Sequence, residues 1–205
     1  MKNLTSLAGI ALLAISLSQQ AQADVIVDTG TPSGIGYAPL TFDGGDWLAA
    51  EFTTTQSWDI GSIAGYINGI DSNQAGNTFT ITIYDGNTPP KPGTTNQEFS
   101  QQATFTGNGW NGLSGLNWNL AAGTYWLAFE IGPNNDTFQG NMPVSTANPL
   151  STASYDGLST GGYQAATGAG NDIGVTISSV PVPPSLLLFV SGLFALGRFG
   201  KRKSV

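Results

Sequence analysis

Alternation of apolar and polar residues at every second position is the feature that most constrains the fold of this chain. In "TFTITIYD" (Thr78–Asp85), Phe79, Ile81 and Ile83 fall on one face of an extended strand and the threonines fall on the other. Segments of this kind recur along the chain, and no convincing 3.6-residue helical periodicity accompanies them. The pattern therefore predicts strands with one dry face and one polar face.

A second strand is predicted at "GTYWLAFEI" (Gly123–Ile131), with Tyr125 and Leu127 on its dry face and Trp126 on its polar face. Turns rich in Gly, Asn, Asp and Pro separate the predicted strands. Short strands between such turns predict an all-β fold, a β-sandwich of jelly-roll-like type, with a barrel as the alternative. The remaining strands are predicted at Asp24–Asp28, Leu48–Thr55, Gly61–Ile70, Glu98–Thr106 and Asp172–Ser179.

The stretch 132–170 is poor in apolar residues, and a structureless loop of that length is uncommon inside a compact domain. It contains "LSTASYDG" (Leu150–Gly157), followed directly by the similar "LSTGGYQA" (Leu158–Ala165). The similarity favours a hairpin that carries Tyr155 and Tyr163, and chance similarity is the alternative.

The chain has no cysteine and no histidine. These absences exclude a disulfide, a zinc site of the Cys/His type and a His-based catalytic triad. All thirteen acidic residues lie between Asp24 and Asp172, where Lys91 is the one basic residue. A nucleic-acid partner is not expected, because phosphate binding needs clustered Lys and Arg. The acidic surface is typical of an exported domain that must stay in solution.

The N-terminus has the pattern of a signal peptide. One positive charge precedes the apolar run "LAGIALLAISL" (Leu7–Leu17), and "AQA" (Ala21–Ala23) supplies small residues for cleavage. We expect cleavage after Ala23, so that residues 1–23 are removed and the mature chain begins at Asp24. The prediction implies export by the Sec translocon and processing by signal peptidase.

The C-terminus carries a second apolar segment, Ser185–Phe199. As a helix it would span about 22 Å, which is short for a hydrocarbon core of roughly 30 Å. Basic residues lie at its end and beyond it, and they should stay on the cytoplasmic side of a membrane. They are Arg198, Lys201, Arg202 and Lys203. A short membrane helix with a cationic stop, preceded by a proline-rich spacer, resembles a processing signal more than a permanent anchor.

Residues 180–205 resemble the PEP-CTERM sorting signal of bacteria, in the order proline motif (180–184), transmembrane helix (185–199) and basic tail (198–203). Val180, Pro181, Val182 and Pro183 match the proline motif, with Val182 where the family signature has glutamate. The resemblance implies a precursor held in the inner membrane with a periplasmic ectodomain, handled by an exosortase-type enzyme. It further implies a final place at the outer surface or in the extracellular matrix, with exopolysaccharide as a partner. An ordinary single-span anchor is the alternative.

The ectodomain, residues 24–179, is similar more loosely to β-sandwich domains of bacterial surface proteins with assorted anchors. The segments "AAEFTTTQSWDIGSIAGYI", "GNTFTITIYDGNTPPKPGT" and "LAAGTYWLAFEI" carry this likeness. Such domains have no established common activity, so the likeness implies a fold only.

Catalysis is the third of three hypotheses for the function. Glycoside hydrolysis needs two carboxylates placed across a sugar, but most carboxylates of this chain lie in predicted turns, where Asp usually caps its own backbone. Glu51 and Glu130 lie on predicted strands and form the best candidate pair, although the sequence does not say whether these strands are neighbours. We predict no catalytic residue.

Carbohydrate binding is the second hypothesis, because aromatic rings offer apolar faces for stacking on sugars. Trp126 is the first candidate, and Trp47 and Trp110 follow; core packing is the alternative for each. Asp43 and Asp46 in "DGGD" offer oxygen ligands for Ca²⁺, as does the segment Asn134–Asp136, and no other cofactor is expected. The leading hypothesis is an exported, non-enzymatic surface or matrix protein that presents the sandwich.

Overall fold

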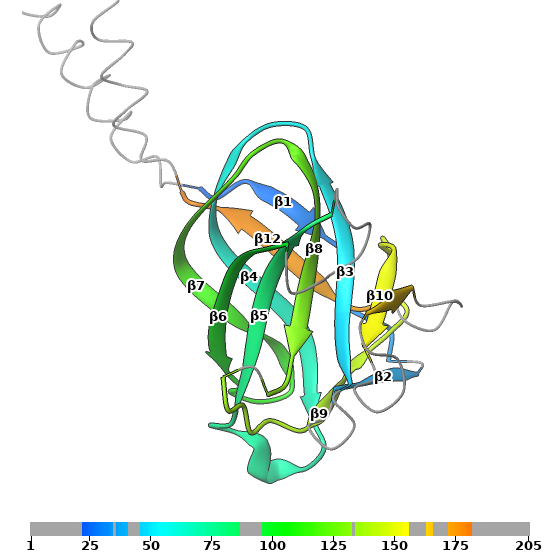
Figure 1. Ribbon diagram of the computed structural model, residues 1–205. Helices are drawn as coiled ribbons and strands as arrows, with labels where there is room; N and C mark the ends of the chain where they lie inside the picture. The colour runs from blue at the N-terminus through cyan, green and yellow to red at the C-terminus, as the bar shows by residue number, and fades with distance from the viewer. Residues whose placement is uncertain are drawn as a thin grey trace, which may run out of the picture. The chain divides into compact units, whose positions relative to one another are not determined.

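Two antiparallel β-sheets make up the regular structure of the protein, as the alternation in the sequence predicts (Figure 1). The computed structural model describes residues 22–34, 36–40, 46–86, 96–132, 134–155, 163–165 and 172–181. The sheets belong to one unit, Val25–Val180, and the chain ends form a separate unit. No helix of the described residues is long and apolar enough to cross a bilayer. The predicted helix at 185–199 lies outside these residues, as does most of the signal peptide.

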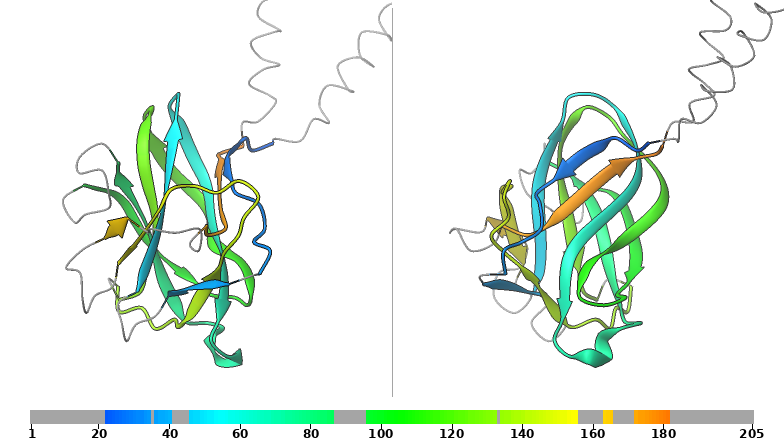
Figure 2. Two further views of the ribbon diagram at one scale, coloured as in Figure 1. Left: turned by 90° about the vertical axis from the view of Figure 1, so that its right-hand side faces the viewer. Right: turned by 180° about the vertical axis from the view of Figure 1, so that it is seen from behind.

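The first sheet has the strand order β1-β12-β4-β9-β2, and β7 also pairs with β4. Strand β4 is the centre of this sheet, because β12, β7 and β9 all pair with it, β9 at its last two residues, Asn68 and Gly69. The right-hand view of Figure 2 shows β1, β12, β4 and β7 side by side. The strands are β1 (Val25–Asp28), β2 (Tyr37–Leu40), β4 (Trp58–Gly69), β7 (Gly109–Leu120), β9 (Gly140–Pro143) and β12 (Val175–Ser179).

The second sheet has the order β11-β10-β3-β8-β5-β6. Strand β8 lies at its centre, where Leu48 of β3 and Ile81 of β5 both pair with Phe129. The strands are β3 (Trp47–Thr54), β5 (Thr78–Asp85), β6 (Gln97–Thr104), β8 (Gly123–Glu130), β10 (Thr152–Tyr155) and β11 (Gln164–Ala165). One short 3₁₀ helix, η1 (Ser72–Gln74), follows β4.

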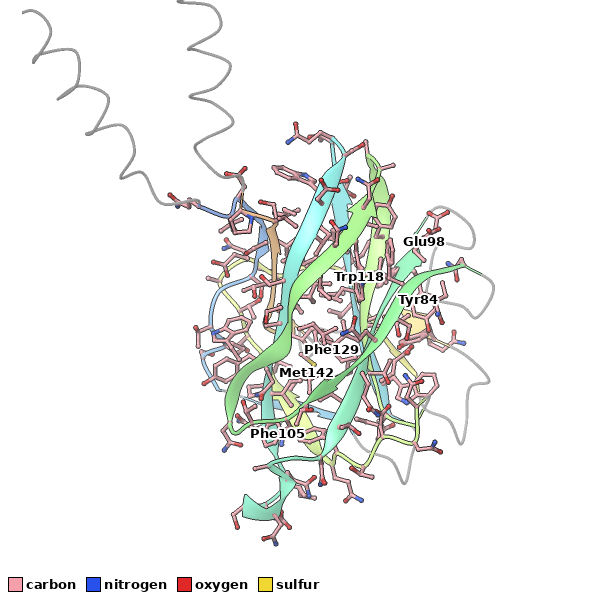
Figure 3. The ribbon with its side chains drawn as sticks, turned by 90° about the vertical axis from the view of Figure 1, so that its left-hand side faces the viewer. Tyr84, Glu98, Phe105, Trp118, Phe129 and Met142 are labelled. Atoms are coloured by element: carbon pink, nitrogen blue, oxygen red, sulfur yellow. The ribbon has the colours of Figure 1, made fainter. Side chains whose placement is uncertain are left out.

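The two sheets face each other across the main hydrophobic core. Phe129 and Met142, from opposite sheets, lie between them (Figure 3). The ring of Phe129 packs closely against β4 at Gly65, because a Cβ at this position would lie 2.6 Å from Cε1 of Phe129. The dry faces predicted for β5 and β8 line the core with Phe79, Ile81, Ile83, Tyr125, Leu127, Phe129 and Ile131, which confirms these face assignments.

The polar face expected for β5 and β8 is not open to water, so the expectation of half-buried strands is wrong. Thr80 and Thr82 are buried, and Tyr84, Trp126 and Tyr163 form a second hydrophobic cluster on this side of the sheet. The pairing of β10 with β11 confirms the predicted hairpin, and Tyr163, the residue before β11, belongs to this cluster. No local pattern signals this second covered face, because threonine and tyrosine suit either environment.

Candidate functional site

A buried carboxyl group lies on the second covered face of the β5–β8 sheet. The side chain of Glu130 is 2% exposed. Its Oε1 accepts hydrogen bonds of 2.8 Å from the hydroxyls of Tyr84 and Tyr163, and its Oε2 accepts one of 2.8 Å from Thr82. We call these four residues the Glu130 network. Burial raises the pKa of Glu130, the nearby Asp136 raises it further, and the three hydrogen bonds oppose this shift.

Asp136 forms a second, similar arrangement next to the first. Its side chain is 3% exposed and accepts hydrogen bonds from Thr80 (2.8 Å), Gln102 (2.9 Å) and the backbone N–H of Gly132 (3.1 Å). The bond from Gly132 closes the turn that follows β8, and the other two tie this turn to β5 and β6. Both carboxyl groups are therefore occupied by donors of the protein itself, an arrangement that stabilises structure and leaves few lone pairs for a substrate.

The candidate pair Glu51 and Glu130 is not brought together. Their strands, β3 and β8, are neighbours, but Glu51 pairs with Trp126, four residues before Glu130. At about 3.4 Å per residue, the two positions are about 14 Å apart along the strands. Glycosidase carboxyl groups are separated by about 5–9.5 Å. The geometry therefore does not fit an acid–base pair across a glycosidic bond.

The first sugar-binding candidate, Trp126, points away from the main core, as the alternation predicts, but it is only 5% exposed. The expectation that its ring meets solvent is wrong. It packs with Ala49, Tyr84, Ala128 and Tyr163, because the segment that carries Tyr163 covers this face. Its indole N–H is buried and has no hydrogen-bond partner.

Trp47 is half-buried at the edge of the same cluster. Its indole N–H donates to the backbone carbonyl of Ile131 at 2.7 Å, and its ring lies 6.1 Å from the ring of Tyr163. These contacts give Trp47 a packing role, which the sequence analysis held as the alternative.

Trp110 is the candidate that the structure leaves most open, at 38% exposure. It lies at the start of β7, directly opposite Tyr66 of β4. The two rings meet edge to face, with centroids 5.4 Å apart and planes at 90°. Trp118, the other Trp of β7, stacks on Phe99 with centroids 5.0 Å apart and packs against the core.

The turn before Trp110 is held by a buried side chain, Asn111. Its Oδ1 accepts from the N–H and the hydroxyl of Thr106, and its Nδ2 donates to the carbonyls of Gly107 and Gly109. Gly109 has a φ of 121°, a conformation that favours glycine. These hydrogen bonds tie the turn to the start of the long strand β7, which the sequence does not predict.

A depression of about 510 Å³ lies at the same end of β4 and β7. Asn108 contributes to its wall and accepts a hydrogen bond of 3.0 Å from the N–H of Gly69. Ile70, which is exposed, and Asp71 and Phe105 also line it. Tyr66 and Asn108 could not be predicted as site residues, because nothing in the sequence pairs β4 with β7.

The remaining site predictions fall largely outside the described residues. Asp43 is outside them, and within the described residues no three Asp or Glu side chains converge as metal ligands. The Ca²⁺ site at Asp43 and Asp46 therefore stays a prediction. Of the processing residues, Ala23, Asp24, Val180 and Pro181 are described, whereas Ala21, Val182, Pro183, Arg198, Lys201, Arg202 and Lys203 are not.

Comparison with protein-family models and with curated proteins finds no match for this chain.

Proposed function

We propose that this chain is an exported, non-enzymatic surface or extracellular-matrix protein that presents a jelly-roll-like β-sandwich outside the inner membrane. The signal-peptide pattern of residues 1–23 and the PEP-CTERM-like tail of residues 180–205 support the export route. The Sec translocon and signal peptidase act first in this route, and an exosortase-type enzyme acts later at the tail. In the extracellular matrix, the proposed partner of the protein is exopolysaccharide.

The observation that favours a non-catalytic role is the state of the acidic residues on the sheet. The carboxyl groups of Glu130 and Asp136 each accept three hydrogen bonds from the protein, and Glu51 lies about 14 Å along the strands from Glu130. Hydrolysis of a glycoside requires one free acid and one free base or nucleophile at closer range. The arrangement supports a structural role for these groups.

Export can be tested by labelling, since the chain has no cysteine of its own. Gln56→Cys places a single thiol at an exposed position between β3 and β4. We expect a membrane-impermeant maleimide to label this variant in intact spheroplasts. The matched variant Ser204→Cys, directly after the basic tail, should react only after lysis. Labelling of Gln56→Cys that also requires lysis would contradict the topology.

A second candidate function is carbohydrate binding, and the exposure of Trp110 favours it. An exposed indole held edge to face against Tyr66 offers an apolar surface on which a sugar ring can stack without any charged group. Trp126 no longer serves this hypothesis, because the sandwich buries it.

A further inference from the structure

The indole of Trp110 is partly open to solvent. In an edge-to-face contact one ring presents its edge and the other presents a face, so a single neighbour covers at most one face of each ring. Tyr66 is the ring neighbour of Trp110 at 5.4 Å, and 38% of the Trp110 side chain stays exposed. The exposed part of the indole therefore remains available for stacking.

The surroundings hold Trp110 in place before any ligand arrives. The four hydrogen bonds of the buried Asn111 side chain fix the turn 106–109, and β7 pairs with β4 from Gly109 onward. A ring that is already fixed loses little conformational freedom on binding, and this lowers the entropic cost of association.

Asn108, two residues before Trp110 in the chain, supplies a hydrogen-bond donor. The backbone N–H of Gly69 donates to the Oδ1 atom of Asn108. This bond identifies which amide atom of Asn108 is the oxygen, and the NH₂ group therefore points away from Gly69. Asn108 is exposed and forms part of the wall of the 510 Å³ depression. Its two amide hydrogens can donate to sugar hydroxyls.

Small side chains follow Trp110 along β7 and β4. On the same outer face, Gly112 and Ser114 of β7 pair with Ala64 and Ser62 of β4. Because these side chains are small, they leave room along the two strands for a polymer that stacks on Trp110 to continue past it. A short ligand would need only the ring and the depression, whereas the row of small side chains suits an extended polysaccharide chain.

Charge selects the kind of polymer. No Lys or Arg lies among the described residues, whereas most of the acidic residues of the chain do. Asp71 lines the depression, and its carboxylate accepts from the N–H of Asn73 at 2.8 Å. A polyanion would meet the like charge of Asp71 here, and its carboxylates or sulfates would find no cationic partner among the described residues.

We propose that Tyr66, Asn108 and Trp110, here called the Trp110 platform, bind an uncharged polysaccharide together with the adjoining depression. The ring of Trp110 stacks on a sugar, and the amide of Asn108 donates to its hydroxyls. The proposal rests on the carbohydrate-binding candidate of the previous subsection, for which it names the site and the class of ligand.

Affinity electrophoresis of the purified full chain tests the proposal, with hydroxyethyl cellulose, galactomannan or dextran in the gel and alginate as the anionic comparison. We expect at least one uncharged polymer to retard the protein and alginate to have no effect. Trp110→Ala should weaken the binding by about tenfold or more, and Trp110→Tyr should retain most of it. Asn108→Asp keeps the acceptor for Gly69 and removes the amide donor, so it should also weaken binding. Val25→Ala, an exposed apolar position on β1, is the matched control and should bind as the wild type does.

Each other outcome overturns a stated part of the proposal. Equal binding by the wild type and Trp110→Ala, with matching melting curves, would overturn the site and leave carbohydrate binding elsewhere on the domain. Retardation by alginate alone would overturn the choice of an uncharged ligand. No retardation by any uncharged polymer would overturn the inference and the carbohydrate-binding candidate, while the cysteine labelling of Gln56→Cys would still decide the export proposal.

Discussion

At the scale of single residues, Glu130 is the least expected feature, because it buries a carboxyl group with no cation among the described residues. The hydroxyls of Tyr84, Tyr163 and Thr82 donate hydrogen bonds to its carboxyl oxygens. Burial raises the pKa of Glu130 above its ordinary value of 4.5, and it also raises the pKa of Tyr84, so that Tyr84 stays a neutral donor. The network therefore joins β5, β8 and the Tyr163 segment through one ionisable group.

The raised pKa of Glu130 predicts how stability depends on pH. Between pH 4.5 and the higher folded-state pKa, the folded protein keeps a proton that the unfolded chain has released. The free energy of unfolding should therefore fall as the pH rises through this window, and it should recover on acidification towards pH 4.5. Glu130→Gln cannot titrate and should flatten the dependence.

Urea unfolding at a series of pH values measures this effect. Glu98→Gln is the matched control, since Glu98 is exposed on β6 and should leave the slope close to that of the wild type. The comparison matters because repulsion among the many acidic residues also weakens the folded state as the pH rises. Equal slopes for Glu130→Gln and the wild type would contradict the assignment.

At the scale of elements, β8 is the strand on which the sandwich depends most. It is hydrogen-bonded on both edges, and its residues from Tyr125 to Glu130 are all buried. Trp126→Ala should lower the free energy of unfolding by about 3–5 kcal/mol, because it empties a packed site next to Tyr84 and Tyr163. Trp126→Phe should cost less, since it keeps a ring and removes an indole N–H that has no acceptor.

Thermal and urea unfolding of the two variants, with Trp110→Ala as the exposed comparison, test this prediction. Trp110→Ala should stay within about 1 kcal/mol of the wild type. A Trp126→Ala variant as stable as Trp110→Ala would mean that the second cluster contributes little and that Trp126 can meet solvent.

The strands themselves were largely predictable, because a dry face leaves a period of two in the sequence. The predicted segment 78–85 coincides with β5, and 123–131 extends one residue beyond β8. Strand β7 was missed, because its Gly, Asn and Ser residues carry little strand propensity and its place is set by pairing with β4. The Trp110 platform was missed in part for the same reason: Trp110 was a candidate, but its partner Tyr66 comes from a strand more than forty positions earlier. Trp126 was misplaced because no local pattern shows that the Tyr163 segment covers its face.

At the scale of the whole molecule, the acidic and basic residues are segregated along the chain. The acidic residues belong to the proposed ectodomain, and four of the six basic residues follow the apolar segment 185–199 or end it. Such a distribution keeps an acidic domain in solution on one side of a membrane and a cationic tail on the other. The sandwich and the tail thus have separate tasks in the proposed function, presentation and sorting.

Neutralising the tail separates these two tasks. Replacement of Arg198, Lys201, Arg202 and Lys203 by Gln should impair membrane retention and processing, because no charge would then hold the end of the short helix on the cytoplasmic side. Pulse–chase electrophoresis in a host with an exosortase should show the precursor leaving the membrane fraction without normal maturation. A charge-preserving control exchanges Lys and Arg at the same four positions and should mature as the wild type does. The control should behave in this way because the positive-inside effect depends on charge and not on the identity of the cation. Normal maturation of the Gln variant would show that the tail is not the sorting signal proposed here.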